Sequence, residues 1–146
     1  MLSKKGQTAV NGPARWVWLA AGLFLLLGLL VQFWRLWSLN ATYDQGIFNQ
    51  VLWNSGHGRW FVSSLSSQLS SAVLHGGMAP DPSYQRLGQH YTPLLLLWAP
   101  LVRWLGLAAL PLVQVGLMTA AGLVLHRLAL RLLPAGLAAA VACSFY

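Results

Sequence analysis

The sequence predicts an all-α, polytopic helical membrane protein with a long extracytoplasmic loop. Its composition is the first reason: 57% of the 146 residues are hydrophobic and only 8% are charged, whereas soluble domains carry about a quarter charged residues. Second, residues 16–37 and 108–126 are apolar runs long enough to cross a hydrocarbon core of about 30 Å as helices. Third, the segment between them contains two shorter apolar stretches that fit helices lying at a membrane surface.

The charge of the chain excludes one class of partner. The net charge is +7, but the basic residues are scattered between apolar runs and form no stripe or cluster. We therefore expect no nucleic-acid binding, and we interpret these residues as topology determinants and contacts to lipid phosphates of the bilayer. The single cysteine, Cys143, excludes a disulfide within the chain and a cysteine-based metal cluster.

Residues 1–15 are predicted to be a cytoplasmic tail and residues 16–37 the first transmembrane helix. A cleaved signal peptide is the alternative, but its apolar core would span only about 7–15 residues and end at small residues. The run here is longer and its far end is bulky, which favours an uncleaved anchor. Lys4, Lys5 and Arg15 place the N-terminus in the cytoplasm under the positive-inside rule.

Residues 38–107 then form the extracytoplasmic loop, which begins with a predicted amphipathic helix at about 44–55. Asp44 lies at the N-terminal edge of this helix, and Gly56 and Gly58 supply stop signals at its end. Its predicted apolar face, with residues at helical spacing, consists of Ile47, Phe48, Val51 and Leu52.

A second loop helix is predicted at 93–104. Pro93 suits the first turn, with Thr92 as a candidate cap. The apolar part is short, and Pro100 and Arg103 interrupt it, so a re-entrant or interfacial helix is favoured over a crossing one. The sequence is compatible with both the interfacial and the membrane-crossing form of this helix.

Residues 108–126 are the second predicted span, and basic residues follow at once in a turn over 127–134. If 93–104 does not cross, Arg127 and Arg131 fall on the cytoplasmic side, as the positive-inside rule prefers. Residues 135–146 form about half a span, so we expect the start of a truncated third span and hence a fragment of a larger protein.

Asp44 is the main candidate for chemistry. An Asp beside a helix start is often an N-cap worth about 1 kcal/mol. A carboxylate held at a membrane surface could also act as a general base or as a metal ligand. The two roles are compatible, because a cap position also fixes the carboxylate in space.

Four further residues of the loop are candidate site residues. His90 precedes the second loop helix and could face Asp44 across the loop, although a loop histidine is commonly just exposed. The guanidinium fork suits phosphate oxygens, so three arginines on the same side as Asp44 are candidate substrate contacts: Arg59, Arg86 and Arg103. Solvated or interfacial arginines are the plainer alternative.

Two motifs of the loop resemble a known family. They are YDQGIFNQVLWN at 43–54, with Gly58-Arg59 after it, and GQHYTP at 88–93, followed by leucine-rich sequence to Leu101. Together with the flanking runs, they resemble the N-terminal part of the bacterial integral-membrane family named domain of unknown function 2079. That family is similar to GT-C-fold membrane glycosyltransferases, which use lipid-phosphate-linked sugars.

The resemblance implies Asp44 as the catalytic base or the carboxylate of a metal site, with a divalent cation as candidate cofactor, and His90 as a residue that contacts the site. It also favours the non-crossing form of 93–104. Two departures matter: this chain has Asn49 where members often have a second Asp, and Gln45 where they have leucine. A missing carboxylate at 49 weakens the metal hypothesis.

The leading hypothesis is therefore the N-terminal fragment of a glycosyltransferase-like protein, multi-pass in a bacterial inner membrane and inactive alone. The alternative is a non-enzymatic membrane subunit or assembly partner, indicated by the apolar, Trp-rich loop helices. A transporter fragment has less support, because neither predicted span carries an ionisable residue at its middle.

Overall fold

The computed structural model describes residues 5–40 and 42–146, and the side chains from residue 12 onward except that of residue 41. The side chains of Lys4 and Lys5, which orient the predicted topology, lie outside this part. The described chain is helical and contains no strand, only an isolated β-bridge between Val62 and Gln85. The all-α prediction is confirmed.

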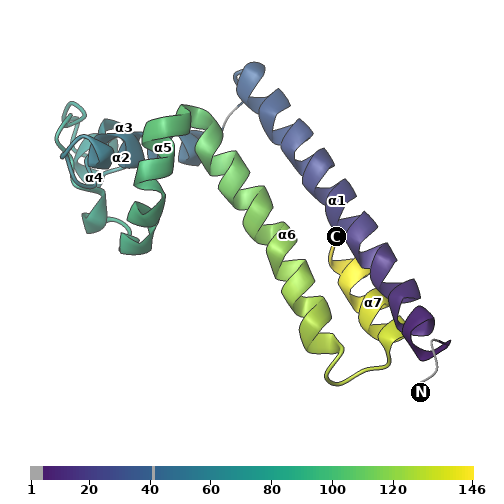
Figure 1. The fold of residues 1–146 in the computed structure, drawn as a ribbon. Coiled ribbons are helices and arrows are strands. Elements are labelled where there is room, and N and C mark those ends of the chain that lie inside the picture. Colours follow the sequence, from purple (N-terminus) through teal and green to yellow (C-terminus); the bar gives the residue numbers. More distant parts are fainter. Residues whose placement is uncertain (1–4, 41) are drawn as a thin grey trace. The chain divides into compact units, whose positions relative to one another are not determined.

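The helices follow one another along the chain as shown in Figure 1. The α-helices are α1 (Lys5–Trp37), α2 (Tyr43–Gly56), α3 (Ser64–Ser67), α4 (Ser71–Leu74), α5 (Ala99–Leu105), α6 (Ala109–Ala129) and α7 (Ala135–Phe145). The 3₁₀ helices are η1 (Arg86–Gly88), η2 (Pro93–Trp98) and η3 (Gly106–Ala108). Two helical stretches are long and apolar enough to cross a membrane, Gly12–Trp37 and Pro93–Ala129.

The chain divides into two compact units, which we name after the predicted spans and the predicted loop. The membrane unit consists of residues 1–32 and 112–146, and the loop unit of residues 33–111.

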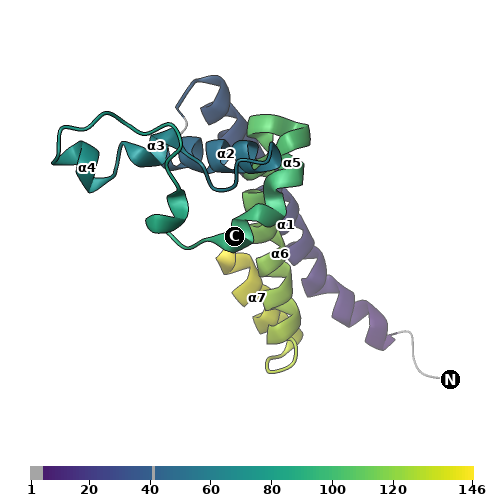
Figure 2. The same ribbon diagram turned by 90° about the vertical axis from the view of Figure 1, so that its left-hand side faces the viewer.

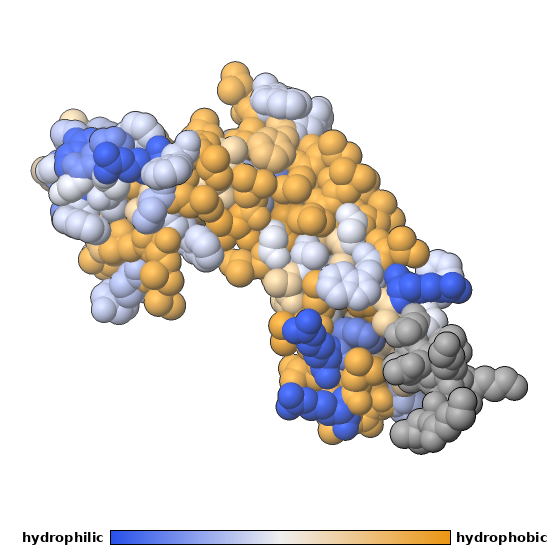
Figure 3. Space-filling model, in the orientation of Figure 1, coloured by the Kyte–Doolittle hydropathy of each residue, from blue (hydrophilic) through white to orange (hydrophobic). Residues whose placement is uncertain are grey.

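In the membrane unit, small residues let the helices approach closely, as expected for packing in lipid. Ala139 and Ala142 of α7 are buried with Val17 of α1. Gly28 of α1 faces Val115 of α6 so closely that a Cβ at position 28 would lie 2.8 Å from Val115 Cγ1. Hydrophobic side chains cover most of the visible surface of these helices (Figure 3), as lipid contact requires.

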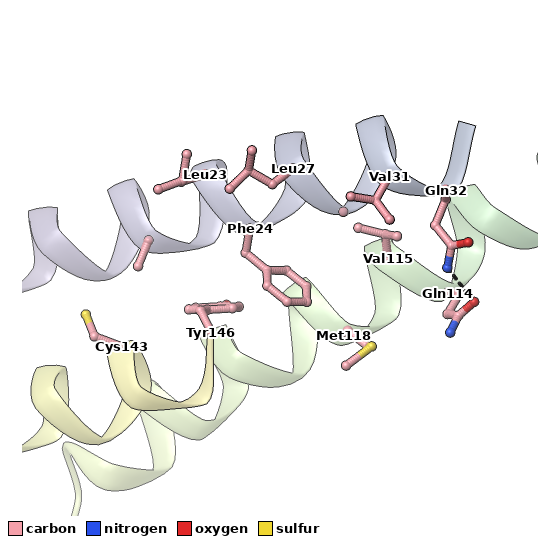
Figure 4. Close-up of a pocket in the computed structure, with 12 residues that line it drawn as sticks. Leu23, Phe24, Leu27, Val31, Gln32, Gln114, Val115, Met118, Cys143 and Tyr146 are labelled. Carbon is pink, nitrogen blue, oxygen red and sulfur yellow. Dashed lines mark hydrogen bonds between the residues drawn. The ribbon is translucent and has the colours of Figure 1, made fainter. Parts of the chain in front are cut away.

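A groove of about 450 Å³ lies between α1, α6 and α7 (Figure 4). Gln32 Nε2 donates to Gln114 Oε1 over 3.2 Å at one end of it (Figure 4). Tyr146 also lines the groove, and its hydroxyl donates to the Thr119 carbonyl oxygen over 2.5 Å. These bonds satisfy polar groups that lipid could not satisfy. None of the predicted site residues lies in this groove.

In the loop unit, α2 is the central helix and packs against α5 (Figure 2). Three of the four residues on its predicted apolar face are buried, namely Ile47, Val51 and Leu52. Phe61 and Leu96 cover Ile47 and Val51, while Ala99 and Val102 of α5 cover Leu52. Asn49 is not one of the residues of the predicted apolar face, but it is also buried, because α2 is covered on more than one side.

The second loop helix differs from the prediction of one helix over 93–104. Pro93 opens the 3₁₀ helix η2, and the α-helix α5 begins only at Ala99. Thr92 makes no side-chain capping bond because its backbone (φ −125°, ψ 58°) is not in the extended conformation typical of a cap. Thr92 is therefore not the predicted cap.

Candidate functional site

Asp44 lies in the first turn of α2, but it is not the N-cap. Thr42 caps the helix in an extended conformation, and its Oγ1 accepts a hydrogen bond from the Gln45 amide over 3.3 Å. The predicted capping role of Asp44 is therefore wrong, because the helix begins at Tyr43, two residues earlier than that role requires. The Asp44 side chain is exposed, and as an anion near the helix N-terminus it interacts favourably with the helix dipole.

Arg86 is the cation near the N-terminal end of α2, and only 5% of its surface is exposed. Its Nη1 donates to Ser66 Oγ over 3.1 Å, and its guanidinium carbon lies 4.8 Å from the centre of the Phe48 ring. Phe48 follows Asp44 by four residues, so the two side chains share one face of α2. Burial lowers the pKa of Arg86, while the charge of Asp44 acts in the opposite direction and raises it.

Backbone bonds fix Arg86 in this position. Its amide donates to the Phe61 carbonyl oxygen over 2.9 Å, beside the bridge between Val62 and Gln85. Ser66, whose hydroxyl accepts the hydrogen bond from the Arg86 guanidinium, is fully buried. Arg86 Nε is also buried and has no hydrogen-bond partner among the described residues. We call Asp44, Phe48, Ser66 and Arg86 the Asp44 site.

Arg59 and Arg103 lie at the other end of α2. Arg59 Nη2 donates to Asn54 Oδ1 over 2.5 Å, and Arg103 Nη1 donates to the Gly56 carbonyl oxygen over 3.2 Å. From residue 44 to residue 56 a helix rises about 18 Å. The structure thus places Arg86 at the same end of α2 as Asp44, with no ion pair between them in the described part of the chain, and places the other two predicted arginines at the opposite end.

His90 is exposed and is held through its backbone, whose amide donates to the Arg86 carbonyl oxygen over 3.1 Å. In the described part of the chain, no hydrogen bond or ion pair joins His90 to Asp44. Its predicted contact with the site remains a prediction.

The residues present do not fit a metal site. Across residues 5–40 and 42–146, no three His, Cys, Asp or Glu side chains gather where they could hold an ion. Asn49, at the position of the expected second carboxylate, is a buried amide whose Oδ1 has no partner among the described atoms. One exposed carboxylate is a poor ligand set for a divalent cation, so we assign no step to a metal.

Sequence reasoning missed two members of the Asp44 site. Phe48 was placed on the apolar face, but it is the surface on which the Arg86 guanidinium rests. Ser66 lies in a serine-rich stretch whose conformation is held by hydrogen bonds to Gln50. Gln50 Oε1 accepts from the Ser63 hydroxyl over 2.7 Å, and Gln50 Nε2 donates to the Ser64 hydroxyl over 2.8 Å. Such long-range bonds leave no periodic signal in the sequence.

The comparison with protein families decides the affiliation of the chain. Residues 35–146 match the family described as "Predicted membrane protein (DUF2079)". The chain belongs to this family. The matched residues include both helices of the loop motifs and every predicted site residue, so the Asp44 site lies within the part that defines membership. No curated protein and no solved structure matches the chain.

Proposed function

We propose that this chain is the N-terminal part of a membrane glycosyltransferase-like protein that takes its sugar from a lipid-phosphate carrier. The observation that carries the proposal is an exposed carboxylate, Asp44, held in the first turn of α2, with the buried Arg86 at the same end of this helix. Membership in a family of predicted membrane proteins and the two candidate spans support a location where lipid carriers reside.

In this proposal Asp44 acts as the general base. It takes the proton of the acceptor hydroxyl while the hydroxyl oxygen attacks the anomeric carbon, and the bond to the carrier phosphate breaks with its electron pair leaving on the phosphate. The cation at the same end of α2 is Arg86, whose guanidinium rests on the Phe48 ring. Of the three arginines predicted to contact the carrier phosphate, only Arg86 lies at the Asp44 end of α2, so the proposed site includes Arg86 and leaves out Arg59 and Arg103.

We also propose a multi-pass location in a bacterial inner membrane with the N-terminus in the cytoplasm. Arg127 and Arg131 are exposed at and after the end of α6, and Figure 3 shows hydrophilic atoms in that region. If α1 and α6 both cross, these arginines lie on the side of the N-terminus, as the positive-inside rule prefers. The loop unit then lies on the extracytoplasmic side.

The chain supplies a matched pair of variants for the test, since Asp44 and Asp81 are its only acidic residues. Both are exposed, and each can be replaced by Asn with the loss of one charge. Sugar transfer from a polyprenyl-phosphate-linked donor would be measured in membranes that contain a complete family member with these two residues. We expect Asp44→Asn to lower the rate by about 10²-fold or more, as the loss of a general base does, and Asp81→Asn to leave it unchanged. Full transfer by Asp44→Asn would refute the proposal.

One observation favours the second candidate, a non-enzymatic subunit or assembly partner. Large aromatic side chains of the loop unit are strongly exposed: Trp104 to 86%, Trp37 to 83% and Tyr91 to 81%. Exposed apolar surface of this kind is typical of contacts with protein or membrane. A partner that co-purifies equally with the wild type and with Asp44→Asn, with no difference in sugar transfer between the two, would favour this function.

A further inference from the structure

A groove of about 580 Å³ lies between the C-terminal end of α2 and helix α5, entirely within the loop unit. We call it the α2–α5 groove. The residues that matter for its chemistry are Gly56, Trp60, Leu96, Pro100, Arg103 and Trp104. It lies at the opposite end of α2 from Asp44, so it is separate from the site proposed for sugar transfer.

Arg103 is the charged side chain of this groove. Its bond to the Gly56 carbonyl oxygen engages one donor and orients the guanidinium, which has five N–H groups in all. The side chain is exposed, so most of these donors remain accessible. Neither acidic residue lines the groove: Asp44 lies about 18 Å away along α2, and Asp81 is bonded to Ser83. The groove therefore presents positive charge in a form that suits phosphate oxygens.

Two tryptophans line the groove together with this cation. Trp60 is 59% exposed and Trp104 is 86% exposed, although burial of a tryptophan side chain is normally favourable. Tryptophan concentrates at the headgroup level of bilayers, where its ring is half in the apolar layer. Arg103 also lies only six residues before Ala109, where the apolar helix α6 begins. If α6 enters the bilayer, Arg103 and Trp104 are held at headgroup level.

We propose that the α2–α5 groove binds the phosphate group of an anionic bilayer phospholipid. Arg103 binds the phosphate, and Trp60 and Trp104 contact the glycerol and the upper part of the acyl chains. A free phosphate ion would gain nothing from the exposed tryptophans, so the combination favours a lipid. The groove anchors the loop unit at the membrane surface. This inference does not depend on the proposed glycosyl transfer.

The test uses the full chain, purified in detergent and mixed with equal amounts of phosphatidylglycerol and phosphatidylcholine. Native mass spectrometry then measures which lipid stays bound. We expect the wild type to retain phosphatidylglycerol preferentially and Arg103→Gln to lose about tenfold in retention, since the variant loses the charge-assisted hydrogen bonds to the phosphate. The matched control is Arg127→Gln, which removes the same charge from another exposed position and should retain the lipid.

Equal retention by Arg103→Gln and the wild type would overturn the proposal, as would equal losses in Arg103→Gln and Arg127→Gln. Displacement of the lipid by millimolar inorganic phosphate would also overturn it, because the site would then recognise free phosphate. If Arg103→Gln does not fold, as judged by circular dichroism, Trp104→Ala tests the same groove, since the exposed Trp104 side chain adds little to folding. We expect a severalfold loss of phosphatidylglycerol in Trp104→Ala, and unchanged retention would count against the proposal.

Discussion

The close approach of α1 and α6 at Gly28 allows a prediction whose magnitude follows from the structure. The Cβ of an alanine at position 28 would lie 2.8 Å from Val115 Cγ1 and 3.4 Å from Cγ2, whereas carbon atoms pack best at about 3.5–4.0 Å. Valine has one strongly preferred rotamer in a helix, so it cannot swing aside freely. Overpacking of this kind costs about 1–3 kcal/mol.

Gly22→Ala is the matched control for Gly28→Ala, because a Cβ at position 22 meets nothing within 4 Å. Both substitutions gain the same helix propensity, about 1 kcal/mol, so this gain cancels in the comparison. We expect Gly28→Ala to be less stable than Gly22→Ala by about 1–3 kcal/mol in the free energy of unfolding. Reversible unfolding in mixed micelles, titrated with SDS and followed by circular dichroism, measures the difference.

A second-site change tests the proposed cause. Val115→Ala removes the methyl groups that clash, so it should destabilise Gly28→Ala by much less than it destabilises the wild type. Equal stability of Gly28→Ala and Gly22→Ala would refute the close packing of α1 on α6. Additive effects of Gly28→Ala and Val115→Ala would show that the two positions do not touch.

Two further predictions concern the loop unit. Thr42→Ala removes the cap of α2 and should cost about 1 kcal/mol, seen as about fivefold faster hydrogen exchange at the Gln45 amide; unchanged exchange would contradict the capping assignment. Hydrogen bonds from the Ser83 hydroxyl and amide lower the pKa of Asp81 below its ordinary value of 3.8. Since the folded pKa is the lower one, the turn over 81–83 is stabilised above pH 3.8, and this contribution is lost as the pH falls through the folded pKa. An NMR titration of the Ser83 amide should therefore show a transition below pH 3.8, and Asp81→Asn, which cannot lose a charge, should show none.

The sequence was sufficient to predict the apolar helices, because membrane helices satisfy their own backbone and need only a long apolar run. It was also sufficient for the buried face of α2, whose Ile47, Val51 and Leu52 recur at helical spacing. The start of α1 was not predictable from hydropathy. This helix begins at Lys5, within the predicted cytoplasmic tail, because polar residues can extend a helix beyond the apolar run that marks a span.

The candidate site was predictable only in part. Asp44 could be singled out because it is one of only two acidic residues. Its position relative to the helix cap could not be predicted, because the cap is Thr42, one residue before the helix. The burial of Arg86 could not be inferred, since it depends on Phe48 and Ser66, which are 38 and 20 positions away in the sequence. Arginine is rarely buried unless it is paired, so local sequence favoured an exposed side chain. Tertiary contacts of this kind decide which of several similar arginines lies at the same end of α2 as Asp44.

The claim on which both proposals depend is that the loop unit and the turn after α6 lie on opposite sides of one bilayer. Single cysteines at Met78, 64% exposed, and at Leu132, 85% exposed, can report these sides after Cys143→Ser removes the native thiol. The measurement is labelling by a membrane-impermeant maleimide in cells whose outer barrier has been opened. We predict that Met78→Cys is labelled while the inner membrane is intact and that Leu132→Cys is labelled only after permeabilisation. Labelling of both cysteines in intact membranes would mean that residues 93–104 also cross the bilayer, and it would contradict the proposed topology.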